Sequence, residues 1–262
     1  MKLIDSHCHL PDDLQKATDI LLRAKEASVT KVINIGTGLK DSLQAQQLNQ
    51  ALPDAYYTIG IYPHEEKHLE IEQIRSGLEK LLAAPNKPVA IGECGIDVIE
   101  NEITTPLERQ EQIFRMQIEL AISHKLPLII HNRNGDDLVY EILKSYEENL
   151  NNGSLKAVTH CFASDLMTAK RFLDLGLYLS FTGMITYQTK SYLLDVIRAM
   201  PNDKLMLETD SPYLTPNPFR KEINEPKYVR IVAQKVAETI NQPLETVCQQ
   251  TYKNTTAFFN LS

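Results

Sequence analysis

The stretch "IDSHCHL" (residues 4–10) joins the end of the first apolar run to two histidines that flank a cysteine. Side chains of a β-strand alternate between two faces, so His7 and His9 are expected on one face and Cys8 on the other. Two imidazoles at the end of one strand can bind the same divalent ion. The stretch therefore predicts a strand that presents metal ligands at its carboxyl end.

Eight short runs rich in Val, Ile and Leu, including this first one, are typical of strands buried on both faces. They are "KLIDSH" (2–7), "KVINIGTG" (31–38), "AYYTIGIYP" (55–63), "PVAIGECGID" (88–97), "LPLIIHNR" (126–133), "LKAVTHCF" (155–162), "LYLSFTG" (177–183) and "KLMLETD" (204–210). Amphipathic helical patterns lie between them, for example from Leu107, where Ile113, Met116 and Leu120 recur at helical spacing. Further helices are expected from about Glu225 and about Leu244.

Eight β/α units of about thirty residues predict an α/β fold of the TIM-barrel type, a (β/α)8 barrel. The alternative is an open, doubly wound sheet. Against it, no Gly-x-Gly-x-x-Gly turn follows any strand, and eight near-equal units close more naturally than they stay open. Because linkers rich in Pro, Gly and Ser are absent, we expect one domain over residues 1–262.

The composition excludes several classes of protein. A net charge of −7 and a pI of about 5.5 argue against a long basic groove for nucleic acid. No apolar run approaches the roughly 18 residues of a membrane span, and the first residues lack a signal-peptide pattern. The four cysteines show no paired spacing, which favours reduced thiols. We therefore expect a cytoplasmic protein without membrane association.

Residues that can bind metal stand at the carboxyl ends of several strands, where barrel enzymes place their active sites. After His7 and His9, the later runs offer Glu93 and Asp97 in "GECGID", His131 in "IIHNR", His160 in "VTHCF", and Glu208 and Asp210 in "LETDSPYL". Four histidines together with two of these carboxylates make six ligands, which exceeds what one catalytic ion needs. Two ions about 3.5–4 Å apart that share a carboxylate fit this number better. Mixed His and carboxylate ligands suit Zn²⁺ and Mn²⁺, and nucleic-acid hydrolysis often uses Mg²⁺.

Other residues near these strand ends are weaker candidates for the site. Cys8, Cys94 and Cys161 adjoin candidate ligands and could be soft ligands, but alternation favours a packing role for them. Asp5, two residues before His7, is expected to point into the barrel and to be hydrogen-bonded, because a buried unpaired carboxylate is costly. His64 in "YPHE" could reach the rim.

The motifs together resemble the TatD family of metal-dependent deoxyribonucleases, over essentially the whole chain. "DSHCHL", "GECGID", "HNR", "THCF" and "ETDSPYLTP" resemble the family's blocks in the same order, and "FRKEINEPKYV" resembles its later segment. The resemblance implies a TIM barrel, a two-metal centre and phosphodiester hydrolysis. It also implies that His7, His9, Glu93 and Asp210 hold one ion, and that Glu93, His131 and His160 hold the other.

One position departs from the family pattern. Tyr62 stands in "GIYPH" where the family often has the first histidine of Gly-x-His-Pro-His. A tyrosine cannot replace histidine as a general acid near neutral pH, but it can hydrogen-bond or stack on a base. Tyr62 is therefore a candidate substrate contact. Three further candidates are expected near the rim because they follow strands: His64, Arg133 and Arg220. Asp210 is the candidate acceptor of the proton from the attacking water, and Glu93 the bridging carboxylate.

The resemblance thus implies a 3′→5′ exonuclease, and the acidic net charge favours DNA ends or short oligonucleotides as its substrates. We expect a monomer. An alternative is a hydrolase of another ester or amide, for example an ester on an RNA end, on the same metal site. A non-catalytic metal or scaffold protein is a third possibility. Turnover of a short single-stranded DNA with added Mg²⁺ or Mn²⁺ separates the three.

Overall fold

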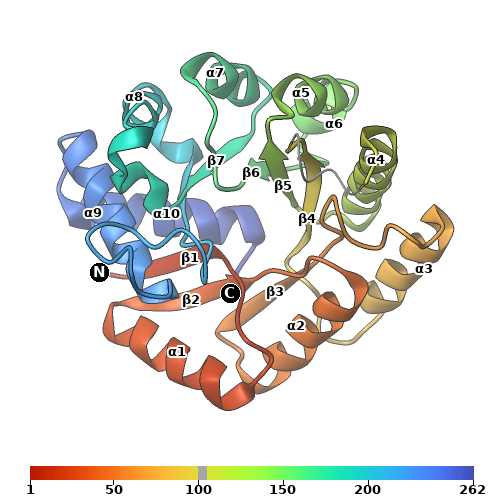
Figure 1. Cartoon of the computed structure of the whole chain (residues 1–262), viewed down its shortest axis with the longest axis horizontal. Coiled ribbons are helices and arrows are strands. Elements are labelled where there is room, and N and C mark those ends of the chain that lie inside the picture. The colour runs from red at the N-terminus through yellow and green to blue at the C-terminus, as the bar shows by residue number, and fades with distance from the viewer. Residues whose placement is uncertain (100–104) are drawn as a thin grey trace.

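The computed structural model describes residues 1–99 and 105–262. Eight parallel strands form one sheet in sequence order, each hydrogen-bonded to the next, and helices surround it (Figure 1). The strands are β1 (Leu3–Cys8), β2 (Val29–Asn34), β3 (Ala55–Ile59), β4 (Ala90–Asp97), β5 (Leu128–Arg133), β6 (Ala157–Thr159), β7 (Tyr178–Phe181) and β8 (Leu205–Leu207). All eight predicted strands are therefore confirmed, although most are shorter than the apolar runs.

Helices connect the strands on the outside of the sheet. They are α1 (Leu14–Glu26), α2 (Leu39–Ala51), α3 (Ile71–Leu82), α4 (Leu107–His124), α5 (Asp136–Lys144), α6 (Glu147–Asn151), α7 (Leu166–Asp174), α8 (Leu193–Ala199), α9 (Val229–Thr239) and α10 (Leu244–Phe259). Short 3-10 turns are η1 (Gly183–Thr186), η2 (Gln188–Lys190), η3 (Asn202–Lys204) and η4 (Pro226–Tyr228). Two helices begin at aspartates that accept a backbone N–H: Asp13 for α1 and Asp165 for α7.

The sheet closes between β1 and the segment that follows β8. Cys8 and Ser211 form a parallel bridge. The backbone N–H of Asp210 donates to the carbonyl of His7 at 2.9 Å, and the N–H of His9 donates to the carbonyl of Ser211 at 2.8 Å. The closed barrel is confirmed and the open doubly wound sheet is wrong. The same hydrogen bonds fix Asp210 beside His7, at the end of β1, and His9, just after it.

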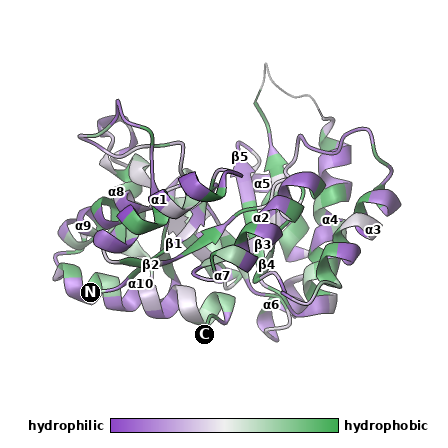
Figure 2. Ribbon diagram, turned by 90° about the horizontal axis from the view of Figure 1, so that it is seen from below, coloured by the Kyte–Doolittle hydropathy of each residue, from purple (hydrophilic) through white to green (hydrophobic). Residues whose placement is uncertain are grey.

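The apolar core has two layers. An outer cluster joins the strands to the surrounding helices and includes Cys8 and Cys94. An inner cluster fills the barrel with side chains from the strands, such as Ile33 and Met206, and with Phe258 and Phe259 at the end of α10. In the side view of Figure 2, α10 and both termini lie at the lower end, where the strands begin. The end of α10 therefore seals this end of the barrel, and the opposite end remains for the site.

The structure also bears on membrane association. Among the residues that the structure describes, no helix is both long enough and apolar enough to cross a bilayer.

Candidate metal centre

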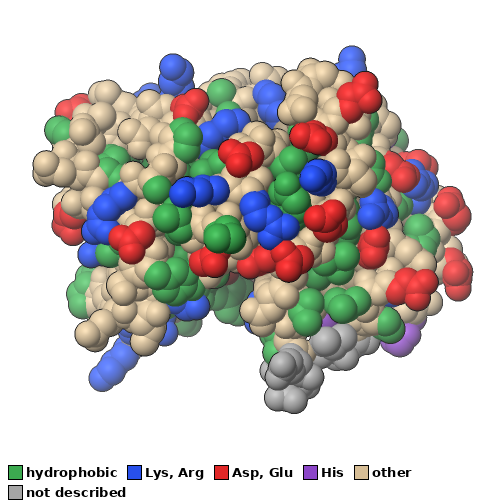
Figure 3. Space-filling model, turned by 90° about the horizontal axis from the view of Figure 1, so that it is seen from above, with side chains coloured by type: hydrophobic (Ala, Val, Ile, Leu, Met, Phe, Trp, Pro, Cys, Tyr) green, Lys and Arg blue, Asp and Glu red, His purple; other side chains and the backbone are tan. Residues whose placement is uncertain are grey.

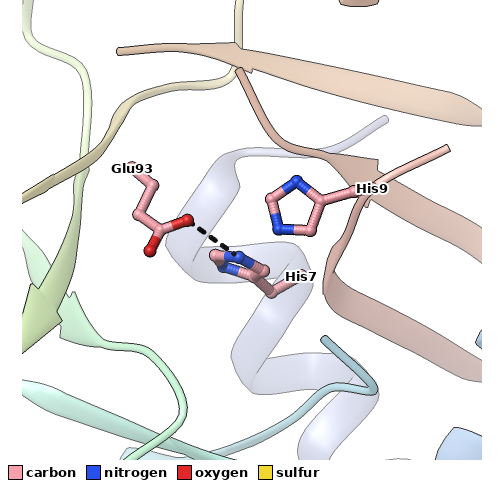
Figure 4. Close-up of side chains that lie close together, drawn as sticks. All are labelled: His7, His9 and Glu93. Carbon is pink, nitrogen blue, oxygen red and sulfur yellow. Dashed lines mark ion pairs between the residues drawn. The ribbon is translucent and has the colours of Figure 1, made fainter. Parts of the chain in front are cut away.

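The carboxyl ends of five strand segments bring four histidines and two carboxylates together. Their ligand atoms form three groups, each with all its atoms within 4.8 Å of one another. The groups are His7, His9 and Glu93; His7, His160 and Asp210; and Glu93, His131 and His160. Figure 4 shows the first group, in which the side chains of His7, at the end of β1, and His9, just after it, lie beside Glu93. The six residues are the same six that the sequence predicts as ligands.

Glu93 lies at the centre of the cluster. Its Oε1 is 2.7 Å from His131 Nδ1 and 3.0 Å from His160 Nε2, and its Oε2 is 3.4 Å from His7 Nε2. The Oδ1 of Asp210 lies 3.6 Å from His7 Nε2 and 3.5 Å from His9 Nε2. The Glu93 carboxylate thus contacts both halves of the cluster, with His7 on one side and His131 and His160 on the other. A ligand that bridges two ions requires this arrangement.

The glycines of "GECGID" explain how β4 delivers this carboxylate. The pairing of β4 with β5 shifts register between Ile91 and Cys94, so Glu93 turns towards the cluster while Cys94 packs in the outer layer. Gly95 has a φ of 147°, and a side chain there would collide with the carbonyl oxygen of His131. Glycine is therefore needed where the two strands that carry Glu93 and His131 approach each other.

The electrostatics of the cluster keep the carboxylates ionised. Burial would raise the pKa of Glu93, but His160, His131 and His7 together hold it well below its usual value. Burial would also raise the pKa of Asp210, but His9 and the other histidines lower it. Ionised carboxylates beside imidazoles are the donor set that divalent transition metals prefer.

Unpartnered nitrogens in the cluster fit a metal ion. Among the described residues, neither ring nitrogen of His7 has a hydrogen-bond partner, although the side chain is fully buried. Buried polar atoms are nearly always paired, so nitrogens left free at such a site need another partner. A divalent cation would satisfy those that face the carboxylates.

Asp97, at the end of β4, organises the rim on one side. Its Oδ2 lies 3.0 Å from His131 Nε2 and accepts hydrogen bonds from the hydroxyl of Tyr62 and from Nη2 of Arg133, the latter at 2.8 Å. Burial would raise the pKa of Asp97, but His131, Tyr62 and Arg133 lower it to about 2. Since Asp97 holds Nε2 of His131, the other nitrogen, Nδ1, is the one turned to Glu93.

The network around Asp97 was not predicted from the sequence. Asp97 was recognised only as a carboxylate at a strand end, and its position in the "GECGID" motif was the available signal. Tyr62 and Arg133 lie beside the cluster: Arg133 Nη2 donates to the Tyr62 hydroxyl at 3.2 Å, and the centroid of the Tyr62 ring lies 4.8 Å from that of His131. Burial and Asp97 raise the pKa of Tyr62 above its ordinary value, so its hydroxyl is not suited to donate a proton to a leaving group.

Glu208 supports the opposite side of the cluster. It is 1% exposed, its Oε1 lies 3.4 Å from Nδ1 of His160, and it accepts the backbone N–H of Cys161 at 2.6 Å. Burial would lower the pKa of His160, but Glu93 and Glu208 raise it well above its usual value. Glu208 was another strand-end carboxylate to which the sequence gave no role.

The remaining predicted residues lie farther out. His64 is half-buried, with its ring centroid 5.8 Å from that of Tyr62. Arg220 is exposed and stacks over the ring of Tyr187 at 4.0 Å. The three donor groups among the described residues contain no cysteine, so the soft-ligand alternative receives no support from the geometry.

Asp5 was expected to be hydrogen-bonded, which is confirmed, and to share the inward face of His7, which is wrong. The pairing of β1 with β2 is irregular between Asp5 and Cys8, and Asp5 pairs with Val32, a residue of the outer cluster. Its carboxylate accepts the N–H of Thr209 at 2.8 Å and the Thr209 hydroxyl. Asp5 thus anchors the residue that precedes Asp210.

Replacement of Asp5 by Ala should lower both stability and activity. It would leave two buried donors of Thr209 unpaired, at a cost of about 1–3 kcal/mol in the free energy of unfolding. Hydrolysis should fall as well, because Asp210 would lose its support. Asp5→Asn, which keeps one acceptor oxygen, should lose less of both. Urea unfolding curves and hydrolysis rates measure the two effects, and an Asp5→Ala protein as stable as the wild type would refute the anchoring role.

Comparison with known proteins agrees with this geometry. The family model described as "TatD related DNase" matches residues 4–260. The chain is 34% identical to the metal-dependent hydrolase YabD of Bacillus subtilis (strain 168), over 99% of this chain and 100% of that protein. It is 32% identical to the protein named 3'-5' ssDNA/RNA exonuclease TatD of Rahnella sp. (strain Y9602), over 93% of this chain and 92% of that protein.

A solved structure agrees in fold as well as in sequence. The crystal structure of YjjV, a TatD homologue from Escherichia coli K12, superposes with a TM-score of 0.87 at 30% identity and covers 99% of this chain and 98% of that one. Family match, relatives and fold therefore coincide over nearly the whole chain, and the six clustered side chains provide metal-binding groups of the kind that the names of these relatives imply. The chain belongs to the TatD family and is a metal-dependent hydrolase.

Proposed function

We propose that the protein is a 3′→5′ exonuclease that removes nucleotides from single-stranded DNA ends with two divalent metal ions. The observation that carries the proposal is Glu93, whose carboxylate contacts donors of both halves of the cluster. Further support comes from the relative whose printed name is 3'-5' ssDNA/RNA exonuclease TatD. The hydrolase domain in this proposal spans residues 1–262.

The family resemblance implies how the ligands divide between the ions, and two of the three donor groups agree with this division. His7, His9, Glu93 and Asp210 would hold one ion, and Glu93, His131 and His160 the other. When bound, such a pair lowers the pKa of water and neutralises charge on a phosphate. The ions would be Mg²⁺, Mn²⁺ or Zn²⁺, and metal analysis of the purified protein distinguishes them.

The protein's own groups supply the other steps. Asp210 is ionised and its side chain is 14% exposed, so it can accept the proton of the attacking water. The side chain of Arg133 is 49% exposed and is held by Asp97 and Tyr62 beside the cluster, where its guanidinium can bind a phosphate of the substrate. Arg220, His64 and the ring of Tyr62 are further proposed contacts.

The charge of the protein supports an enzyme for DNA ends. A net charge of −7 gives little attraction for long duplexes, whose binding depends on many neutralised phosphates. On the face drawn in Figure 3, Lys and Arg side chains alternate with Asp and Glu and form no continuous positive patch. Binding would therefore depend on local contacts at one terminus.

The proposed activity can be tested on three DNA substrates. With Mg²⁺ or Mn²⁺, a short single strand labelled at its 5′ end should shorten stepwise from the 3′ end, faster than the corresponding duplex. A closed circle should be cut slowly or not at all. Rapid nicking of the circle, or an affinity for long duplexes that falls steeply with salt, would contradict the exonuclease proposal.

The same assay separates the alternatives. If DNA resists cleavage while RNA ends, esters or amides are hydrolysed, the metal site serves another substrate, and absence of any turnover with metal bound would favour a non-catalytic role. We also propose a cytoplasmic, monomeric protein: its four cysteines are free thiols, as expected in a reducing compartment. Light scattering of the purified protein measures the oligomeric state.

A further inference from the structure

We propose that Tyr213 is a base-stacking residue, which holds the base of the substrate's terminal nucleotide beside the metal centre. The proposal rests on the proposed nuclease function and names a contact for the base. Tyr213 belongs to the loop of residues 211–224, which follows β8 and the ligand Asp210.

The first argument is the exposure and position of the ring. Tyr213 is 63% exposed, so most of its side chain is open to solvent. Its ring centroid lies 6.2 Å from that of His9, and the two rings stand edge to face at 69°. Because His9 is a proposed metal ligand, a free aromatic face stands directly beside the place where a phosphate would be held.

The second argument is the rigidity of the backbone beneath the ring. The N–H of Tyr213 donates to the carbonyl of Asp210 at 2.9 Å. The side-chain amide of Asn224, a residue only 2% exposed, donates to the carbonyl of Tyr213 and to that of Thr209, the latter at 2.8 Å. The loop thus fixes the backbone of Tyr213 against Asp210 while the ring remains free. A ring held in place before binding loses little conformational entropy when a ligand stacks on it.

The third argument is the chemistry of the substrate. Proteins that bind single strands stack successive bases on aromatic side chains, and these contacts tolerate any sequence because every base has a π-face. An acidic protein that cannot rely on many phosphate contacts needs such an uncharged source of affinity. The loop carries other exposed apolar side chains, Phe219 and Ile223, but Tyr213 is the one whose ring packs against a residue of the metal centre.

The test compares Tyr213→Ala and Tyr213→Phe on two oligonucleotides. One ends in an ordinary 3′ nucleotide, and the other ends in an abasic nucleotide with the same phosphates. On the ordinary substrate, Tyr213→Ala should raise KM by about 5- to 150-fold with a smaller change in kcat, as expected for one lost base stack. On the abasic substrate it should change KM little. Tyr213→Phe, which keeps the ring, should behave as the wild type on both.

A binding measurement provides a readout independent of turnover. An oligonucleotide with a 3′-terminal 2-aminopurine, joined by a non-hydrolysable phosphonate linkage, should lose fluorescence on binding to the wild type and to Tyr213→Phe. With Tyr213→Ala this quenching should be lost. Leu22→Ala is the matched control, since Leu22 is also a large exposed side chain, at 57%, but lies on α1. It should leave KM and quenching unchanged.

Four results would overturn the proposal. An equal loss on both substrates would show that Tyr213 supports the loop rather than a base. A loss in Tyr213→Phe as large as in Tyr213→Ala would assign the effect to the hydroxyl. An unchanged Tyr213→Ala, with the wild type active on DNA, would refute stacking and leave the nuclease function intact, whereas a wild type inactive on both oligonucleotides would refute both.

Discussion

Substitution of Glu93 by Gln should abolish hydrolysis, with a fall in kcat of about 10³-fold or more, and should remove most of the bound metal. The Glu93 carboxylate contacts His7, His131 and His160, and its charge is held there by a strongly lowered pKa. Gln has nearly the same shape but carries no charge and offers one oxygen, so it cannot serve two cations. The fold should survive, because the barrel's apolar layers are unaffected.

The metal content decides how this result is interpreted. Elemental analysis after dialysis should find two ions per chain in the wild type and one or none in Glu93→Gln, with similar melting temperatures. Glu208→Gln is the matched control, since Glu208 is buried beside His160 but is not a proposed ligand. Its amide oxygen can still accept the N–H of Cys161, so most metal should be retained. Two ions and near-normal activity in Glu93→Gln would refute the bridging assignment.

The sequence predicts that the six side chains meet, because this prediction depends on local patterns. Parallel strands of a barrel have all their carboxyl ends on one rim, so residues distant in sequence, such as His7 and His160, are expected to meet once the strands are recognised. Closure adds a restraint that the motifs do not show: Asp210 is joined to His7 through the backbone at the seam of the barrel.

The supporting network was harder to predict because it depends on irregular backbone and on long side chains. Asp97 binds Tyr62, from the segment after β3, and both His131 and Arg133 from β5, and no spacing rule relates these separate segments. Alternation gave the wrong face for Asp5 because β1 contains a register irregularity between Asp5 and Cys8. Strict periodicity fails where a strand is bent to aim functional side chains.

His9→Ala should lower activity but not stability, whereas Cys8→Ala, at the neighbouring residue, should lower stability but not activity. His9→Ala removes a donor of the first group and should lower hydrolysis by at least about 10²-fold, since even outer partners of metal ligands cost 10- to 100-fold. Its stability should change little, because the His9 side chain is 24% exposed. His7→Ala should be at least as inactive.

Cys8→Ala should instead cost stability and little activity. Cys8 is fully buried in the outer cluster, its thiol contacts the carbonyl of Ile33 at 3.5 Å, and burial raises its pKa, so it stays a neutral packing group. Removal of the sulfur leaves a small cavity worth about 1–2 kcal/mol in the free energy of unfolding. Unfolding midpoints and DNA hydrolysis measured side by side for the alanine variants of Cys8 and His9 test the register of β1. An inactive Cys8→Ala beside an active His9→Ala would mean that the face turned to the metal carries the thiol, because a shift of one residue exchanges the two faces of a strand.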